Sequence, residues 1–140
     1  YLPKKERFTN LRLDSVKEVK TLEIVPDFEA HRQALERNLS KVFGVSFGND
    51  HTNDWIKLTL QIDEKKENFI LDRLKREGQG GTLTKVGENT FTFEKEIFDG
   101  NEMMPWVKTF IGRIVSFESN NEYVKKKFYY DIQQMIDMYK

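Results

Sequence analysis

The sequence predicts an α+β protein built on one antiparallel sheet. Between residues 55 and 118, apolar positions with a two-residue period alternate with apolar positions at helical spacing, in the order β-α-β-β-α-β. This order is typical of a split βαβ arrangement, the ferredoxin-like plait, which packs two helices on one face of the sheet. An additional helix is expected before the plait and a long helix after it. With 140 residues, of which 38% are hydrophobic, the chain can bury one core.

Four segments have the pattern of strands. Ile56, Leu58, Leu60 and Ile62 alternate with polar residues, which indicates a half-buried strand. Two further strands are expected over 82–86 and 90–98, joined by a turn at Gly87-Glu88-Asn89. A fourth is expected over 114–118.

Helices are expected between and around these strands. The first should begin at Asp27 as its cap, place Phe28, Leu35, Leu39 and Val42 on one face, and stop near Gly44. The second should span 64–77 behind an Asp63 cap, bury Phe69, Ile70, Leu71 and Leu74, and end at the glycines of 78–81.

The third helix should open at 99–101 and reach about residue 111, provided that Pro105 lies near its first turn. The last helix should start with a capping box of Ser119 and Glu122. Its apolar residues form one stripe at helical spacing: Val124, Phe128, Ile132, Met135, Ile136 and Tyr139.

The N-terminal region has a different pattern. Residues 7–13 alternate polar and apolar side chains and are expected to form a short strand without its partners. Residues 48–54 are polar and are the best linker candidate. We therefore divide the chain into residues 1–25, residues 26–54 with the connecting helix and linker, and a domain over 55–140.

Composition excludes several classes of function. Twenty-three basic residues balance 23 acidic ones, which argues against a protein that binds polyanions over its whole surface. The absence of cysteine excludes disulfides, thiolate metal sites and a cysteine nucleophile. No run of about 18 apolar residues and no signal peptide pattern occurs, so we expect a cytoplasmic protein outside the membrane.

No motif of catalysis or cofactor binding stands out. His31 and His51 lack the spacing of metal ligands, and the glycines of 78–81 follow a helix, whereas a phosphate-binding loop precedes one. We therefore expect no enzyme activity, no cofactor and no metal. An enzyme using carboxylates near Glu96 and Asp99 is a weaker alternative, as is nucleic-acid contact through Lys125-Lys126-Lys127 or through Phe91 and Phe93.

Three stretches carry a family resemblance. They are residues 7–16, RFTNLRLDSV; residues 35–48, which contain LERNL and VFGVSFG; and residues 102–115, EMMPWVKTFIGRIV. The chain resembles the C-terminal part of the bacterial WYL-domain transcriptional regulators. Residues 1–25 resemble the closing strand of the WYL barrel, with Ser15 and Val16 where the family usually has Arg and Ile, and residues 55–140 resemble the C-terminal extension.

The resemblance implies a regulatory and dimerisation domain without catalysis of its own. It implies a longer protein with a winged helix that binds DNA and a WYL domain that senses an effector or nucleic acid, and it implies a homodimer. The alternative is an effector-binding module for a small anionic ligand or single-stranded nucleic acid. Its candidate residues are Arg12, Trp106 and Arg113. The competing interpretation is that Arg113 pairs with a carboxylate and Trp106 fills the core.

Overall fold

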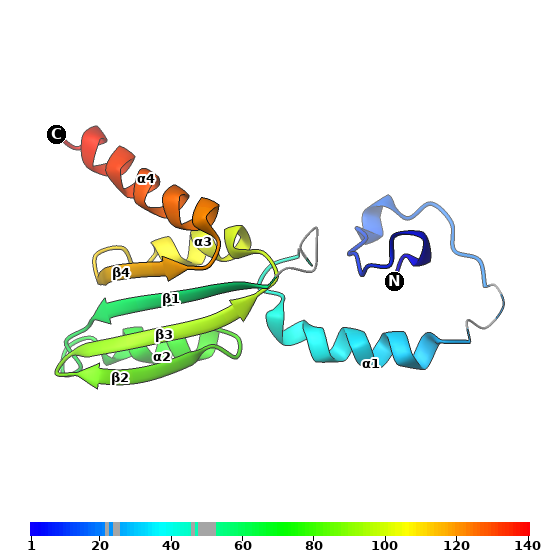
Figure 1. Cartoon of the computed structure of the whole chain (residues 1–140), viewed down its shortest axis with the longest axis horizontal. Helices are drawn as coiled ribbons and strands as arrows, with labels where there is room; N and C mark the ends of the chain where they lie inside the picture. Colours follow the sequence, from blue (N-terminus) through cyan, green and yellow to red (C-terminus); the bar gives the residue numbers. More distant parts are fainter. Residues whose placement is uncertain (22, 24–25, 46, 48–52) are drawn as a thin grey trace.

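The protein combines one antiparallel sheet with flanking helices, which confirms the α+β class. A computed structural model describes residues 1–21, 23, 26–45, 47 and 53–140 (Figure 1). The elements of these residues are α1 (Phe28–Asn38), β1 (Asp54–Gln61), α2 (Asn68–Glu77), β2 (Thr82–Gly87), β3 (Thr90–Ile97), α3 (Gly100–Lys108), β4 (Ile114–Ser119) and α4 (Glu122–Met138). The predicted order of strands and helices between residues 55 and 118 is confirmed.

The sheet has the strand order β2-β3-β1-β4, and every neighbouring pair is antiparallel. Its register places Leu58 of β1 opposite Phe93 on one side and opposite Phe117 on the other. Leu83 of β2 lies opposite Phe93 in turn. One apolar row therefore crosses all four strands, and β2 and β4 are the two edges.

Helices α2 and α3 cover the face that carries this row, and both lie behind the sheet in Figure 1. The residues of β1 alternate between buried and partly exposed positions up to Leu60, because successive side chains point to opposite faces. The helices contribute six buried apolar side chains: Ile70, Leu71, Leu74, Met103, Met104 and Val107. Phe69, which we expected to be buried, is 63% exposed.

The glycines after α2 are explained by the close approach of Phe93. A Cβ atom on Gly78 would lie 2.5 Å from the Phe93 ring, and one on Gly81 would lie 2.2 Å from it. Gln79 and Gly80 between them have positive φ angles of 45° and 84°. The expected helix stop followed by a tight turn is therefore confirmed.

The caps of the helices differ from those predicted. Helix α2 begins at Asn68, because the Asp63 carboxylate accepts the backbone N–H groups of Lys65 and Lys66 and holds 63–67 in a separate turn. Helix α4 is capped by Asn121, whose side-chain oxygen accepts from the second and third backbone N–H groups that follow it. The predicted box of Ser119 and Glu122 does not form, and the Asp27 side chain makes no cap bond to α1.

Helix α3 is shorter than predicted. It begins at Gly100, where the Asp99 side chain accepts the N–H of Asn101, and it ends at Lys108 instead of about 111. Pro105 lies in its second turn, one turn later than we expected. Because proline supplies no N–H, the helix lacks the hydrogen bond that residue 105 would otherwise donate to the preceding turn.

The N-terminal residues do not form the predicted strand over 7–13. They make one isolated bridge, Leu2 with Arg7, and a short 3₁₀ helix at Leu13–Ser15. Leu11 and Leu13 are 75% and 89% exposed. A strand needs a neighbour for its backbone groups, and among the described residues only Arg7 of this stretch makes a bridge, to Leu2. Of the expected linker at 48–54, residues 48–52 lie outside the described part of the chain.

Helix α1 confirms the predicted connecting helix over Phe28–Asn38, but none of its residues is buried. It continues into a short 3₁₀ helix, Leu39–Lys41, which contacts the sheet. The backbone N–H of Phe98 bonds to the Lys41 carbonyl at 3.0 Å, and Phe43 packs against the core beside Trp106. The face predicted from Phe28 to Val42 is therefore used only at its C-terminal end.

Candidate interaction surface

Helix α4 has two halves with different surroundings. In the first half Val124 and Phe128 are fully buried, and the Phe128 ring stacks on Phe117 of β4 with centroids 4.4 Å apart. The side chain of Asn121 also donates to both carboxylate oxygens of Asp54 at 3.1 Å, which ties the start of α4 to the start of β1. The first half is thus part of the domain core.

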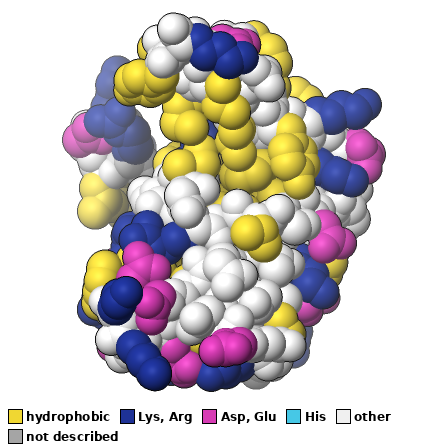
Figure 2. Space-filling model, turned by 90° about the vertical axis from the view of Figure 1, so that its left-hand side faces the viewer, with side chains coloured by type: hydrophobic (Ala, Val, Ile, Leu, Met, Phe, Trp, Pro, Cys, Tyr) yellow, Lys and Arg dark blue, Asp and Glu magenta, His cyan; other side chains and the backbone are white. Residues whose placement is uncertain are grey.

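The second half of α4 leaves the domain. Ile132 is still partly packed against the core, but Ile136, Met138 and Tyr139 are 42%, 80% and 86% exposed. Figure 1 shows the C-terminal end of α4 projecting away from the sheet, and Figure 2 shows hydrophobic side chains gathered beneath this end. The predicted stripe is therefore continuous in sequence, but the core covers only its beginning.

The free edge of β4 lies beside this helix. Tyr129 of α4 places its hydroxyl against the backbone of Phe117: the Phe117 N–H donates to it at 3.2 Å, and it donates to the Phe117 carbonyl at 3.1 Å. Val115, the neighbouring residue on the same edge, is 63% exposed. An apolar helix face and an edge strand thus adjoin one another.

An ion-pair cluster fixes α4 against α3. The Asp131 carboxylate accepts from the Lys108 ammonium of α3 and from Lys127 one turn earlier on α4. The hydrogen bond from Lys108 is the largest cause that lowers the pKa of Asp131, and Lys127 adds to it. Ion pairs therefore hold α4 against α3 at the point where the apolar contacts of α4 end.

Trp106, one of the three residues proposed for effector binding, is partly buried and packs against the core of the domain. Its ring packs among Phe43, Phe93 and Phe110, with centroid distances of 4.9–5.5 Å. Its indole N–H donates to the Glu77 carboxylate at 2.9 Å, which joins α3 to α2. This placement agrees with the interpretation that Trp106 fills the core.

The two proposed arginines are paired elsewhere. Arg113 donates to Glu67, and this hydrogen bond is the main cause that lowers the pKa of Glu67. Arg12 pairs with Asp14 on the exposed N-terminal segment. Arg12, Trp106 and Arg113 have no common partner among the described residues, so the structure does not bring them together as one site.

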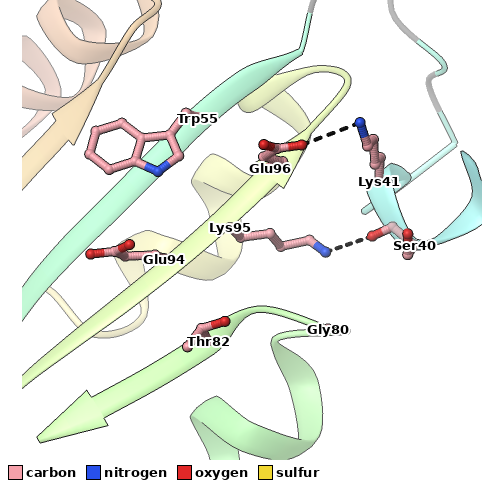
Figure 3. A pocket seen from close by; sticks show the side chains of 8 residues that line it. All are labelled: Ser40, Lys41, Trp55, Gly80, Thr82, Glu94, Lys95 and Glu96. Carbon is pink, nitrogen blue, oxygen red and sulfur yellow. Dashed lines mark hydrogen bonds and ion pairs between the residues drawn. The ribbon is translucent and has the colours of Figure 1, made fainter.

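A polar hollow that the sequence analysis missed lies where β3 extends beyond β2. It measures about 330 Å³, and its lining includes Ser40, Trp55, Glu94, Lys95 and Glu96. The Lys95 side chain is buried and donates to the Ser40 carbonyl at 2.7 Å (Figure 3). It also donates to the Gln79 carbonyl at 2.6 Å. Burial lowers the pKa of Lys95.

The signal for Lys95 was present in the sequence. It follows Phe91 and Phe93 at a two-residue period, so it occupies an inward position of a predicted strand. A charged residue at such a position requires buried partners. Here the partners are two backbone carbonyls from different segments, and the ammonium works as a clamp between them.

The described residues contain no group of three or more His, Cys, Asp or Glu side chains placed to hold a metal ion. In the same part of the chain, no helix combines the length and the apolar character needed to cross a membrane.

Comparisons with known proteins add no relative. No family model matches the chain, and no curated protein or solved structure matches it.

Proposed function

We propose that this chain is a non-catalytic association module that pairs with a second copy of itself through α4. The observation that carries the proposal is the uncovered second half of the apolar stripe, in particular Ile136 and Tyr139. Apolar area of this kind gains about 25 cal/mol per Å² when it leaves water. A helix face that is apolar and unpacked over its last turns therefore favours a protein partner.

Symmetry favours a second copy as that partner. A two-fold contact brings the same stripe together from both sides, so one sequence feature supplies both halves of the interface. Stable interfaces bury roughly 600–1,000 Å² per partner, which exceeds the area of two helical turns. The adjoining edge of β4, where Val115 is 63% exposed, would have to join α4 in the contact.

We further propose that the domain is a ferredoxin-like plait. The connection from β1 through α2 to β2 passes over β3, and the connection from β3 through α3 to β4 passes over β1. Both connections carry a helix on the same face of the sheet (Figure 1). This arrangement supports two interleaved split βαβ units.

Our proposal for the wider role is a regulatory and dimerisation domain at the C-terminal end of a bacterial transcriptional regulator that acts in the cytoplasm. It rests on the resemblance of residues 7–16, 35–48 and 102–115 to the WYL-domain regulators. DNA would then be bound by a winged helix encoded upstream. The sequence of the complete reading frame tests this, because a frame without a winged helix and a WYL domain before Tyr1 would rule it out.

Charge reversal on the stripe tests the association itself. Ile136→Glu places a carboxylate in the proposed interface and should weaken self-association at least tenfold, measured by sedimentation equilibrium. Gln134→Glu adds the same charge on the opposite side of the helix, where Gln134 is exposed, and should leave it unchanged. A wild-type chain that stays monomeric at about 1 mM, or equal effects of both variants, would contradict the proposal.

A further inference from the structure

At one residue of the edge strand β4, the outward backbone groups are covered by a side chain. Residues on the β1 side of β4 are identified by their bonds: the N–H of Asn120 donates to the Trp55 carbonyl, and Ser116 and Glu118 lie opposite Thr59 and Lys57. Because both backbone groups of one residue in an antiparallel ladder point to the same side, Phe117 turns its N–H and C=O away from β1. Phe117 is therefore the central outward residue of the edge.

The Tyr129 hydroxyl occupies the place of a missing strand at this residue. It accepts from the Phe117 N–H at 3.2 Å and donates to the Phe117 carbonyl at 3.1 Å, the two bonds that an added strand would make. An unpaired pair of groups at an edge is a template for another strand. The side chain of Tyr129 is itself 47% exposed, so the hydroxyl contact holds it without burying it in the core.

We infer that β4 is a strand-docking edge closed by Tyr129, and that the β4 strand of a second copy is the partner it takes when Tyr129 moves away. Antiparallel pairing about Phe117 would place Ser116 opposite Glu118 and Val115 opposite Ser119. No like charges face each other in this register, so the strand is compatible with itself. The exposed Val115 would gain a neighbour.

The position of the edge links it to the proposed α4 contact. Tyr129 lies between Phe128, which is buried, and the exposed second half of the helix, so a copy bound to the stripe would lie next to the edge. Tyr129 then decides which surface is used: with the hydroxyl in place, copies meet through helices, and without it they can also meet through strands. The inference adds a second surface to the proposed function and can hold without it.

Tyr129→Phe removes the hydroxyl that bonds to the Phe117 backbone and keeps the aromatic ring. We expect it to form species of higher mass than the wild type by sedimentation equilibrium, with the Phe117 amide protected from hydrogen exchange in those species. Tyr130→Phe is the matched control, because Tyr130 is 63% exposed and has no hydrogen bond among the described residues. The assemblies of this variant should have the same mass in solution as those of the wild type.

The double variant Tyr129→Phe/Ile136→Glu separates this inference from the proposed function. A dimer of this variant, with a monomeric Ile136→Glu, supports strand docking independently of the helix contact. If Tyr129→Phe exposes the Phe117 amide to faster exchange and keeps the wild-type mass at every concentration, the edge is not a docking site, whatever the wild-type oligomer is. Because Tyr129 is half-exposed and the ring is retained, the variant should keep the wild-type circular dichroism spectrum.

Discussion

The sheet domain and the N-terminal arm, residues 1–45, both contain apolar side chains, but these side chains are buried to very different extents. Every buried hydrophobic residue of the described chain lies between Ile56 and Phe128. In the arm, Leu11, Leu13 and Val19 are more than 70% exposed, although they are as apolar as the residues of the core. Apolar residues of this chain therefore build a core only where paired strands bring distant segments onto one face.

The two regions meet at a small set of contacts. Lys95 donates to the carbonyl of Ser40, the Phe98 N–H donates to the carbonyl of Lys41, and the Phe43 ring packs beside Trp106. Two of these contacts are single hydrogen bonds to backbone carbonyls, and Phe43 is the arm residue among them that reaches the aromatic packing of the domain. The comparison can therefore be tested by substitutions that remove a core contact, a contact between the regions, or a surface ion pair.

The largest effect is expected in the core. Phe93→Ala empties the centre of the apolar row, where Phe93 is fully buried, and should lower the free energy of unfolding by about 3–5 kcal/mol. Leu13→Ala removes a similar apolar side chain from the arm and should change it by less than about 0.5 kcal/mol. Urea denaturation measures both values, and comparable losses would mean that the arm has a core of its own.

An intermediate effect is expected where the two regions join. Lys95→Met keeps the length of the side chain but leaves the carbonyls of Ser40 and Gln79 without their donor, which should cost about 1–3 kcal/mol. Hydrogen exchange should rise in 39–42 while the strands stay protected. Lys85→Met, at an exposed position of β2, is the control and should cost less than about 1 kcal/mol.

The smallest effect is expected from pH. The pKa values of Asp131 and Glu77 are lowered in the folded protein, chiefly by hydrogen bonds from Lys108 and Arg73, so their pairs stabilise the fold above the unfolded pKa values of about 3.9 and 4.3. This stability is lost as pH falls through the lower folded values. Because the Asp131 pair is partly exposed, it should contribute no more than about 1 kcal/mol.

Lys108→Gln removes the principal cause of the Asp131 shift. Its stability should therefore fall less between pH 6 and pH 3 than that of the wild type, by roughly a few tenths of a kcal/mol, in urea titrations across this range. Lys126→Gln, an exposed lysine of α4 without an ion pair among the described residues, should follow the wild-type curve. A Lys108→Gln curve parallel to that of the wild type would show that the pair contributes nothing.

Periodicity determined the elements of the sheet domain because its signals are local. The alternation from Ile56 to Ile62, the turn at 87–89 and the stripe of α4 each specify their element within a few residues, and all of these elements occur. The residue that caps the start of a helix was harder to predict. Asn121 and Ser119 are both good cap residues for α4, and only the path of the chain into the helix selects Asn121.

Part of the candidate surface could be predicted from the sequence. The stripe from Val124 to Tyr139 was evident, and so was the competing structural interpretation of Trp106 and Arg113. Two contacts could not be predicted from the local sequence: the hydrogen bonds of Tyr129 to the backbone of Phe117, and those of Lys95 to the carbonyls of Ser40 and Gln79. Each of them joins a side chain to backbone atoms of a distant segment.

Within residues 54–138, spacing along the chain was enough to predict the order of strands and helices, because periodicity is a local property; the same reasoning predicted a strand over 7–13 that does not form. The three-dimensional arrangement decides that the stripe of α4 is buried at Phe128 and open at Tyr139, and that residues 8–12 make no bridge to any described segment. The physical reason is that burial and strand pairing depend on where distant segments end in space, and the sheet next to α4 ends before the helix does.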